Sequence, residues 1–243
     1  MIRAVSAAEA AALPPRSEAL LRIAAAAQAY GDEWQALRFW RGDDGSVIAL
    51  WDGTATLHAA EEVEDALLFL TMSPDVHAVR TDEASAERLA AMWGTNAVSG
   101  DVMRAAQPLE AVGAVESVPP SAVYPLLHET FGEAVPPFDV WYADVHHRLR
   151  RGRFDAAAVT AGDAVVSCAL TTAQTAEAAL LGGVATAPAF RGRGYASACV
   201  TRLARHMQAA RRDVWISPKN ASAAALYRRL GFVPCGRWGM VTK

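Results

Sequence analysis

The chain has 243 residues, of which 52% are hydrophobic and 20% charged, and its formal net charge is −3. This length accommodates one large domain or two small ones, and the composition is that of a globular protein rather than a disordered one. The slightly acidic balance excludes a general attraction to nucleic acid or anionic membranes, so any anion site must be built from local residues.

In the first half, the sequence predicts a helix, a three-stranded meander, a helix, a strand and a last helix. Asp-Gly pairs at 44–45 and 52–53 separate the strands of the meander, which is a strong hairpin signal. Asp82 is placed to cap the last helix, which ends at Gly94. The predicted helices are 17–29, 61–70 and 83–93, and the predicted strands are 36–40, 47–51, 54–59 and 76–80.

Residues 95–112 mix Gly, Asn, Ser and Pro with little periodicity, which is typical of a linker. We therefore expect an N-terminal α/β domain over residues 1–108 and a C-terminal domain over residues 109–243. The three cysteines, Cys168, Cys199 and Cys235, form no C-x-x-C pair, which argues against disulfides or zinc. No signal-peptide core or bilayer-length apolar run occurs, so a cytoplasmic protein is predicted.

The second half repeats the order of the first. Strands and helices that alternate around one sheet predict an α+β, layered α/β fold with a mixed central sheet flanked by helices. The repeated order fits an internal duplication, but it also fits any mixed α/β chain, and both interpretations stay open. The predicted strands are 114–118, 155–160, 165–171, 178–186, 214–216 and 232–241, and the predicted helices are 121–131, 139–150, 195–211 and 221–230.

The most informative segment is the turn after strand 178–186. Pro188 ends the strand, and Arg191-Gly192-Arg193-Gly194 opens an amphipathic helix at Tyr195. The N-terminus of a helix presents unpaired N–H groups and partial positive charge to phosphate groups, and glycine lets the backbone approach a pyrophosphate closely. The turn has neither the Gly-Lys-Ser/Thr ending of a Walker A loop nor the distal acid of a dinucleotide-binding G-x-G-x-x-G motif.

Residues Arg191 to Ala196 fit (Arg/Gln)-x-x-Gly-x-(Gly/Ala), and in this they resemble the GNAT N-acetyltransferase superfamily. Residues 183–186 resemble that family's central strand, and 220–232 resemble its Asn…Tyr…Leu-Gly-Phe helix. The resemblance covers roughly residues 112–243 in element order. It implies the acyl-CoA N-acyltransferase (GNAT) fold and acetyl-CoA as cosubstrate, with no metal. The implied cofactor-binding residues are Val184, Ala185, Thr186, Arg191, Gly192, Arg193, Gly194, Tyr195, Ala196, Asn220 and Tyr227.

Asn220 and Tyr227 are seven residues apart, so both can face one side of a helix. From the residues alone, Asn220 could be only an N-cap and Tyr227 only a packing aromatic. The resemblance implies that Tyr227 is the general acid that protonates the CoA thiolate as it leaves. Glu177 is one candidate for the general base, although a solvated carboxylate fits that position better, and the base stays unassigned.

The helix 139–150 is dense in aromatic, His and Arg residues. The resemblance implies that it walls the acceptor pocket, and Trp141, Tyr142 and His146 are the candidate substrate residues. The alternative, which we favour for most of this helix, is an amphipathic helix with packing aromatics and a basic C-terminal end.

In the first half, the equivalent of the phosphate-binding turn is residues 57–64, which contain no glycine and several acids. Acids at a helix N-terminus repel a pyrophosphate, so we expect this half, as a degenerate GNAT-like unit, to bind no CoA. It could wall the acceptor cleft, or it could serve only as a structural partner.

The predicted function is therefore acetyl transfer from acetyl-CoA to a primary amine of a small molecule. We expect a monomer or homodimer without nucleic-acid or membrane partners. Three alternatives stay open: a protein or peptide acceptor, a non-catalytic acyl-CoA-binding regulatory module, and transfer of a longer acyl group.

Overall fold

The computed structural model describes residues 1–31, 34, 36–107, 109, 115 and 118–243. The chain forms two compact units: Met1–Val102 with Pro234–Lys243 (unit 1), and Met103–Val233 (unit 2). This division differs from the predicted boundary at residue 108. The main difference is the C-terminal segment Pro234–Lys243, which the prediction assigned to the second domain but which lies in unit 1 because it pairs with a strand there.

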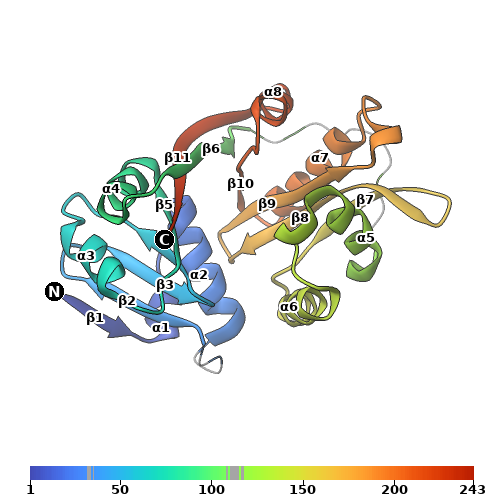
Figure 1. Ribbon diagram of the computed structural model, residues 1–243. Helices are drawn as coiled ribbons and strands as arrows, with labels where there is room; N and C mark the ends of the chain where they lie inside the picture. The colour runs from blue at the N-terminus through green and yellow to red at the C-terminus, as the bar shows by residue number, and fades with distance from the viewer. Residues whose placement is uncertain (32–33, 35, 108, 110–114, 116–117) are drawn as a thin grey trace. The chain divides into compact units, whose positions relative to one another are not determined.

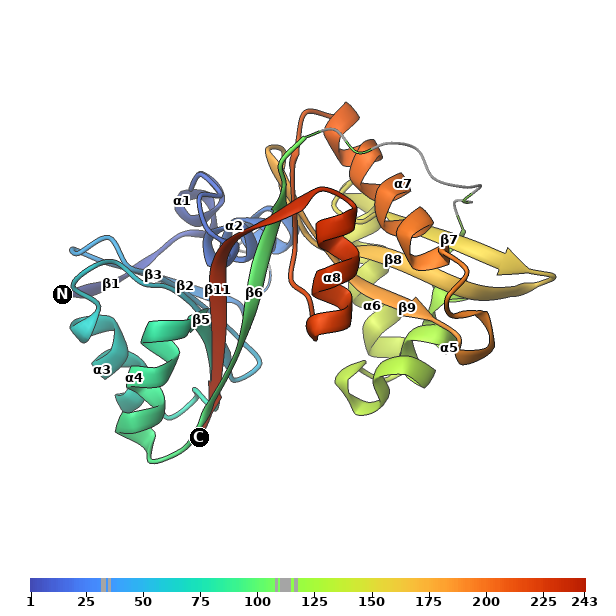
Figure 2. The same cartoon turned by 90° about the horizontal axis from the view of Figure 1, so that it is seen from above.

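Unit 1 is a mixed sheet with helices on both faces (Figure 1). Its strand order is β1-β2-β3-β4-β5-β11, and neighbouring strands are antiparallel except for the parallel pair β4–β5. Helix α2 packs on one face, and α3 and α4 lie on the other (Figure 2). The elements are β1 (Ile2–Val5), α1 (Ala7–Ala11), α2 (Glu18–Tyr30), β2 (Arg38–Gly42), β3 (Val47–Trp51), β4 (Thr54–His58), α3 (Glu64–Met72), β5 (Ala78–Asp82), α4 (Glu83–Trp93) and β11 (Phe232–Thr242).

The helix ends of unit 1 follow from local chemistry. The Ser17 and Asp82 side chains accept hydrogen bonds from backbone N–H groups in the first turns of α2 and α4, so the predicted Asp82 cap is confirmed. Gly94 ends α4 in the left-handed conformation. Helix α1 was not predicted, although Ser6 and Glu9 form a capping box that is readable as Ser-x-x-Glu.

Unit 2 has the strand order β6-β10-β9-β8-β7, in which β9–β10 is the parallel pair. Helix α7 covers one face of its sheet, and α5 and α6 lie on the other (Figure 2). Of the predicted strand 114–118, only residues 115 and 118 are described. The elements are β6 (Ala97–Ala105), α5 (Pro120–Phe131), α6 (Phe138–Arg150), β7 (Ala156–Ala161), β8 (Ala164–Gln174), β9 (Ala178–Thr186), α7 (Tyr195–Ala209), β10 (Asp213–Ile216) and α8 (Ala221–Arg229).

The prediction of a linker at 95–112 is wrong for its first part, because β6 runs from Ala97 to Ala105. Gly100 and its polar neighbours have low strand propensity, so the sequence pattern does not predict a strand here. The strand forms because it pairs with other strands of the sheet; Met103 and Arg104, for example, pair with β10. Gly100 also serves a purpose in the strand, because a Cβ there would lie 2.9 Å from the indole Nε1 of Trp238.

The same order of elements occurs twice: three antiparallel strands, a helix, a parallel strand, a helix and a last strand. In each run, the last strand pairs outside its own run. Strand β6 follows α4 in the chain but pairs with β10, whereas Trp238–Thr242 of β11 pair antiparallel with Ala78–Asp82 of β5. The repeated topology supports the internal duplication. The exchange of last strands has no counterpart in the prediction.

Candidate functional site

The site begins where strand β9 extends beyond the end of its parallel neighbour, β10. Pairing between β9 and β10 ends at Leu181 opposite Ile216, whereas β9 continues to Thr186. Beyond Leu181, no described residue of β10 pairs with β9, so this edge of the backbone is open to a ligand. Gly183 lies in this stretch at φ +55°, and a Cβ there would come within 2.8 Å of Leu170 Cδ1.

The turn into α7 leaves N–H groups available for an anion. Gly194 is the N-cap at φ +81° and carries no side chain that could cap the helix. The first helical bond runs from Ala198 N–H to Gly194 O (3.0 Å), and among the described residues the preceding N–H groups, those of Tyr195, Ala196 and Ser197, have no backbone partner. These are the groups that bind phosphate at helix N-termini.

The two arginines of the turn point differently. The Nε of Arg191 donates to Thr186 O (3.1 Å), which holds its guanidinium beside the open end of β9. Arg193 donates to Ala189 O (3.2 Å), and its guanidinium lies 5.2 Å from the centre of the Phe190 ring. Arg191 therefore belongs to the site, whereas Arg193 stabilises the turn.

A cavity of about 700 Å³ connects these features within unit 2. It extends from the open end of β9, past the turn and the start of α7, to α8. Every predicted cofactor-binding residue except Arg193 lines it. These lining residues are Val184, Ala185, Thr186, Arg191, Gly192, Gly194, Tyr195, Ala196, Asn220 and Tyr227.

Helix α8 brings Asn220 and Tyr227 to one wall of the cavity. Asn220 is the N-cap, and its Oδ1 accepts a hydrogen bond from Ala223 N–H (2.9 Å), so the predicted cap is confirmed. Tyr227 is only 5% exposed, and burial raises the pKa of its phenol to about 12. The phenol is therefore fully protonated at neutral pH and can donate a hydrogen bond or a proton into the cavity.

Several lining residues were missed in the sequence. Ser222, Leu226 and Arg229 have the spacing i, i+4, i+7, which places them on one stripe of α8. Their shared stripe could be recognised from the spacing. Ser222 and Arg229 are polar, however, and polar residues on a short helix ordinarily face solvent, so the spacing gave no reason to assign them to a site. The other lining residues not predicted are Thr130, Phe190, Ser197 and Ala223.

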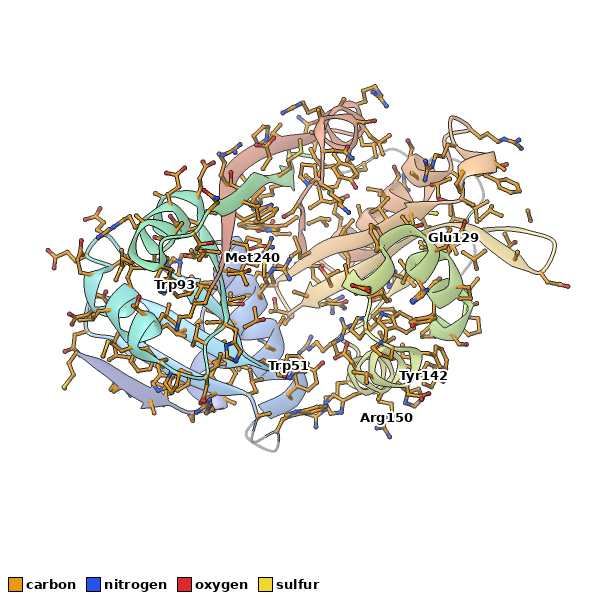
Figure 3. The ribbon with its side chains drawn as sticks, in the orientation of Figure 1. Trp51, Trp93, Glu129, Tyr142, Arg150 and Met240 are labelled. Atoms are coloured by element: carbon orange, nitrogen blue, oxygen red, sulfur yellow. The ribbon has the colours of Figure 1, made fainter. Side chains whose placement is uncertain are left out.

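The three candidate substrate residues lie on α6, and none of them lines this cavity. Trp141 is only 8% exposed and packs in the core against the Tyr124 ring, with 5.2 Å between centroids. Tyr142 stacks on Phe138 at 5.4 Å, and its ring lies 5.6 Å from His146. Figure 3 shows Tyr142 and Arg150 on α6 and Glu129 on α5. Packing accounts for Trp141, while Tyr142 and His146 are half-buried.

Glu177 is exposed at the start of β9, whereas the cavity lies at the strand's other end. At about 3.3 Å per residue, Glu177 is about 23 Å along the strand from Val184, the first β9 residue that lines the cavity, which is too far for proton transfer. Among the described lining residues there is no carboxylate or imidazole.

Burial raises the pKa of the Cys168 thiol to about 12 and that of Cys199 to about 11, so neither is a thiolate nucleophile at neutral pH.

In unit 1, internal side chains occupy the corresponding position. Pairing of β4 with β5 extends to Thr56 opposite Arg80, and His58 at the end of β4 hydrogen-bonds Ser17 Oγ (3.2 Å). The buried Glu18 carboxylate accepts from the Arg80 guanidinium (2.8 Å) beside it. A buried carboxylate near this strand end disfavours a pyrophosphate.

Two absences concern only the described part of the chain. Its residues contain no group of three or more His, Cys, Asp or Glu that could hold a metal ion. Of its helices, none is both long and apolar enough to cross a bilayer.

Comparison with known proteins shows which family residues of unit 2 resemble. Residues 121–232 match the family model described as "Acetyltransferase (GNAT) family". A search of the curated proteins finds no match.

Solved structures resemble the chain over both units. They include a Drosophila protein (TM-score 0.70, 12% identity, 99% of this chain and 98% of that one). A GCN5-related N-acetyltransferase from Sphaerobacter thermophilus has a TM-score of 0.63 and 20% identity over 99% of this chain and 94% of that one. A tandem GNAT protein from the clavulanic acid biosynthesis pathway has a TM-score of 0.59 and 15% identity over 100% and 98%. At these identities the similarity shows the fold alone, and it confirms the predicted GNAT fold.

Proposed function

We propose that this chain, whose residues 121–232 match the acetyltransferase (GNAT) family model, transfers an acetyl group from acetyl-CoA to a primary amine of a small molecule. One observation carries the proposal. The cavity combines an uncapped helix N-terminus, an open strand edge and a buried, protonated phenol. These are the groups that a phosphorylated thioester donor requires.

Each wall of the cavity would hold one part of the donor. The free N–H groups at the start of α7 and the guanidinium of Arg191 would bind the pyrophosphate. The open backbone of β9 between Leu181 and Thr186 would hydrogen-bond the amides of the pantetheine arm, much as an added strand does. Together these contacts would direct the thioester toward Tyr227.

The chemical step needs no metal and no protein nucleophile. The nitrogen lone pair of the neutral amine attacks the thioester carbonyl, a C–N bond forms, and the C–S bond breaks. The Tyr227 phenol gives its proton to the departing thiolate, while the proton of the acylated nitrogen passes to water and the phenolate regains a proton from solvent. The base is assigned to water because no described lining residue is a carboxylate or imidazole.

The test is a screen of amine acceptors for release of free CoA, run on the wild type and on Tyr227→Phe. If Tyr227 is the general acid, the variant should retain acetyl-CoA affinity within about twofold but lose roughly 100-fold or more in kcat. The panel should contain small amines, amino acids and peptides, because the acceptor class is part of the proposal.

The outcomes separate the alternatives. Acetyl-CoA binding without turnover on any amine would favour a non-catalytic acyl-CoA-binding module. Turnover on peptides alone would favour a protein acceptor. Absence of acetyl-CoA binding would overturn the proposed function.

A further inference from the structure

The end of α8 places an additional cation at the cavity. Arg229 lines the cavity, its side chain is exposed, and among the described residues it takes part in no ion pair. Arg228, the preceding residue on the same helix, is equally exposed but does not line the cavity. The contrast between these neighbours shows that the helical phase, rather than the basic composition of α8, directs Arg229 at the cavity.

Two stripes of α8 face the cavity. Asn220, Ala223 and Tyr227 form one, and Ser222, Leu226 and Arg229 form the other. Tyr227 on the first stripe is buried, whereas Asn220 at its start is exposed, as are Ser222 and Arg229 on the second stripe. Tyr227 is therefore placed for the reacting end of a ligand, and Ser222 and Arg229 are placed for a part of the ligand that lies close to solvent.

The charges of the cavity match those of the donor. CoA carries phosphate at two separate places, the pyrophosphate and the 3′-phosphate of its ribose. In the proposed function, Arg191 and the N-terminus of α7 bind the pyrophosphate. Arg229 is the only other Lys or Arg among the described lining residues.

We propose that Arg229, with Ser222 beside it, binds the 3′-phosphate of CoA and thereby selects CoA thioesters over pantetheine thioesters that lack this group. This inference rests on the proposed function. A guanidinium provides paired N–H donors for a phosphate, and Ser222 adds a hydroxyl on the same stripe.

The test compares the equilibrium binding of CoA and 3′-dephospho-CoA by titration calorimetry. The proteins are the wild type, Arg229→Ala and, as a matched control of equal charge change, Arg228→Ala. The wild type should bind CoA about 10-fold more tightly than 3′-dephospho-CoA, which is a typical effect of one charged hydrogen-bonded contact. Arg229→Ala should lose this preference by weakening CoA alone, and Arg228→Ala should retain it.

Three results would overturn the assignment: a wild type that binds both ligands equally, an Arg229→Ala variant that weakens both equally, or an Arg229→Ala variant that keeps the preference. The second result would place Arg229 on the pyrophosphate or pantetheine instead. Failure of the wild type to bind either ligand would overturn the proposed function itself. Thermal unfolding of each variant shows whether it is folded, and the conservative Arg229→Lys should restore part of the preference.

Discussion

At the scale of single residues, burial determines the pKa of the Tyr227 phenol. Because desolvation raises the pKa of its phenol to about 12, the protonated form should persist above pH 10, where an exposed tyrosine ionises. At saturating substrates, we expect the rate of CoA release to show no decline between about pH 8 and pH 10. A pH–rate profile checks this. A decline with an apparent pKa near 10 that is absent in Tyr227→Phe would contradict it.

Glu18 is the buried charge on which unit 1 depends. Its side chain is only 6% exposed, and its carboxylate accepts from Arg22 (2.6 Å) and Arg80 (2.8 Å). Burial acts to raise the pKa of Glu18, but the two guanidinium groups outweigh it and hold the pKa below its usual value. Glu18→Gln leaves the half-buried Arg80 guanidinium without its carboxylate partner, and we expect it to lower the free energy of unfolding by about 3 kcal/mol at pH 7.

The pH dependence of this loss has a definite sign. A depressed pKa stabilises the fold above the unfolded-state value of about 4.3 and ceases to do so as pH falls through the folded-state value. The difference between wild type and Glu18→Gln should therefore shrink below about pH 4 in denaturant unfolding experiments. Glu64→Gln, which removes an exposed ion pair with Arg88, is the control and should have little effect at either pH.

Individual residues were predictable where their immediate neighbours in the chain determine the local geometry. The spacing of Asn220 and Tyr227 predicted that they share one side of a helix, and both line the cavity; the family resemblance, rather than the spacing, was the reason to select them. Arg229 was not found, because nothing local distinguishes it from Arg228; only the position of α8 against β9 does. Trp141 was interpreted in two ways, and its burial supports the packing interpretation.

At the scale of elements, the turn into α7 depends on backbone conformation. At Gly194, with φ +81°, an added Cβ would meet nothing within 4 Å, so Gly194→Ala introduces backbone strain without a steric clash. We expect a loss of roughly 1–2 kcal/mol in stability. Because relief of the strain moves the N–H groups of the turn, CoA affinity should fall as well, about 10-fold in a calorimetric titration.

Gly162→Ala is the matched control for this change. Gly162, in the turn between β7 and β8, also has positive φ (+60°) and free space, but it does not line the cavity. It should show a similar loss of stability with unchanged CoA affinity. Equal losses of affinity in both variants would contradict a local role for Gly194.

Elements with strong local patterns were predictable. The run at β9 was identified with its exact bounds, because a continuous apolar stretch ended by Pro is unambiguous. Strand β6 was missed for the opposite reason. Its Ser-Gly-Asp centre has low strand propensity, and the strand forms through pairing and the contact of Gly100 with Trp238.

At the scale of the whole molecule, Gly239 shows how the end of the sequence stabilises unit 1. A Cβ at Gly239 would overlap the Ala86 side chain and lie 3.1 Å from Glu83 Cα, a backbone atom of α4. Gly239→Ala should lower the free energy of unfolding of unit 1 by about 2 kcal/mol. Hydrogen exchange should show faster exchange in β5 and α4.

Gly236→Ala, in the same strand, is the control. A Cβ there meets nothing within 4 Å and the backbone is not left-handed, so exchange should be unchanged. If Gly239→Ala leaves the β5 amides as protected as in the wild type, β11 does not stabilise this unit.

The repeated order of elements was visible in the sequence, but the exchange of last strands was not. Each strand was identifiable from its own pattern, whereas its partner was not. No local signal specifies that Trp238–Thr242 pair with Ala78–Asp82 rather than with a strand nearby in the sequence. Partner choice is a property of the assembled sheet.

The exchange has a consequence for biosynthesis. Residues of β5 and their β11 partners are separated by about 160 positions, which a ribosome covers on the order of ten seconds. During that interval the nascent first unit exposes the β5 edge that β11 later covers. Such an edge is a template for pairing with other chains. Slow translation or a stall after β5 should therefore promote aggregation of the nascent chain, and ribosome-associated chaperones should be most needed in that interval.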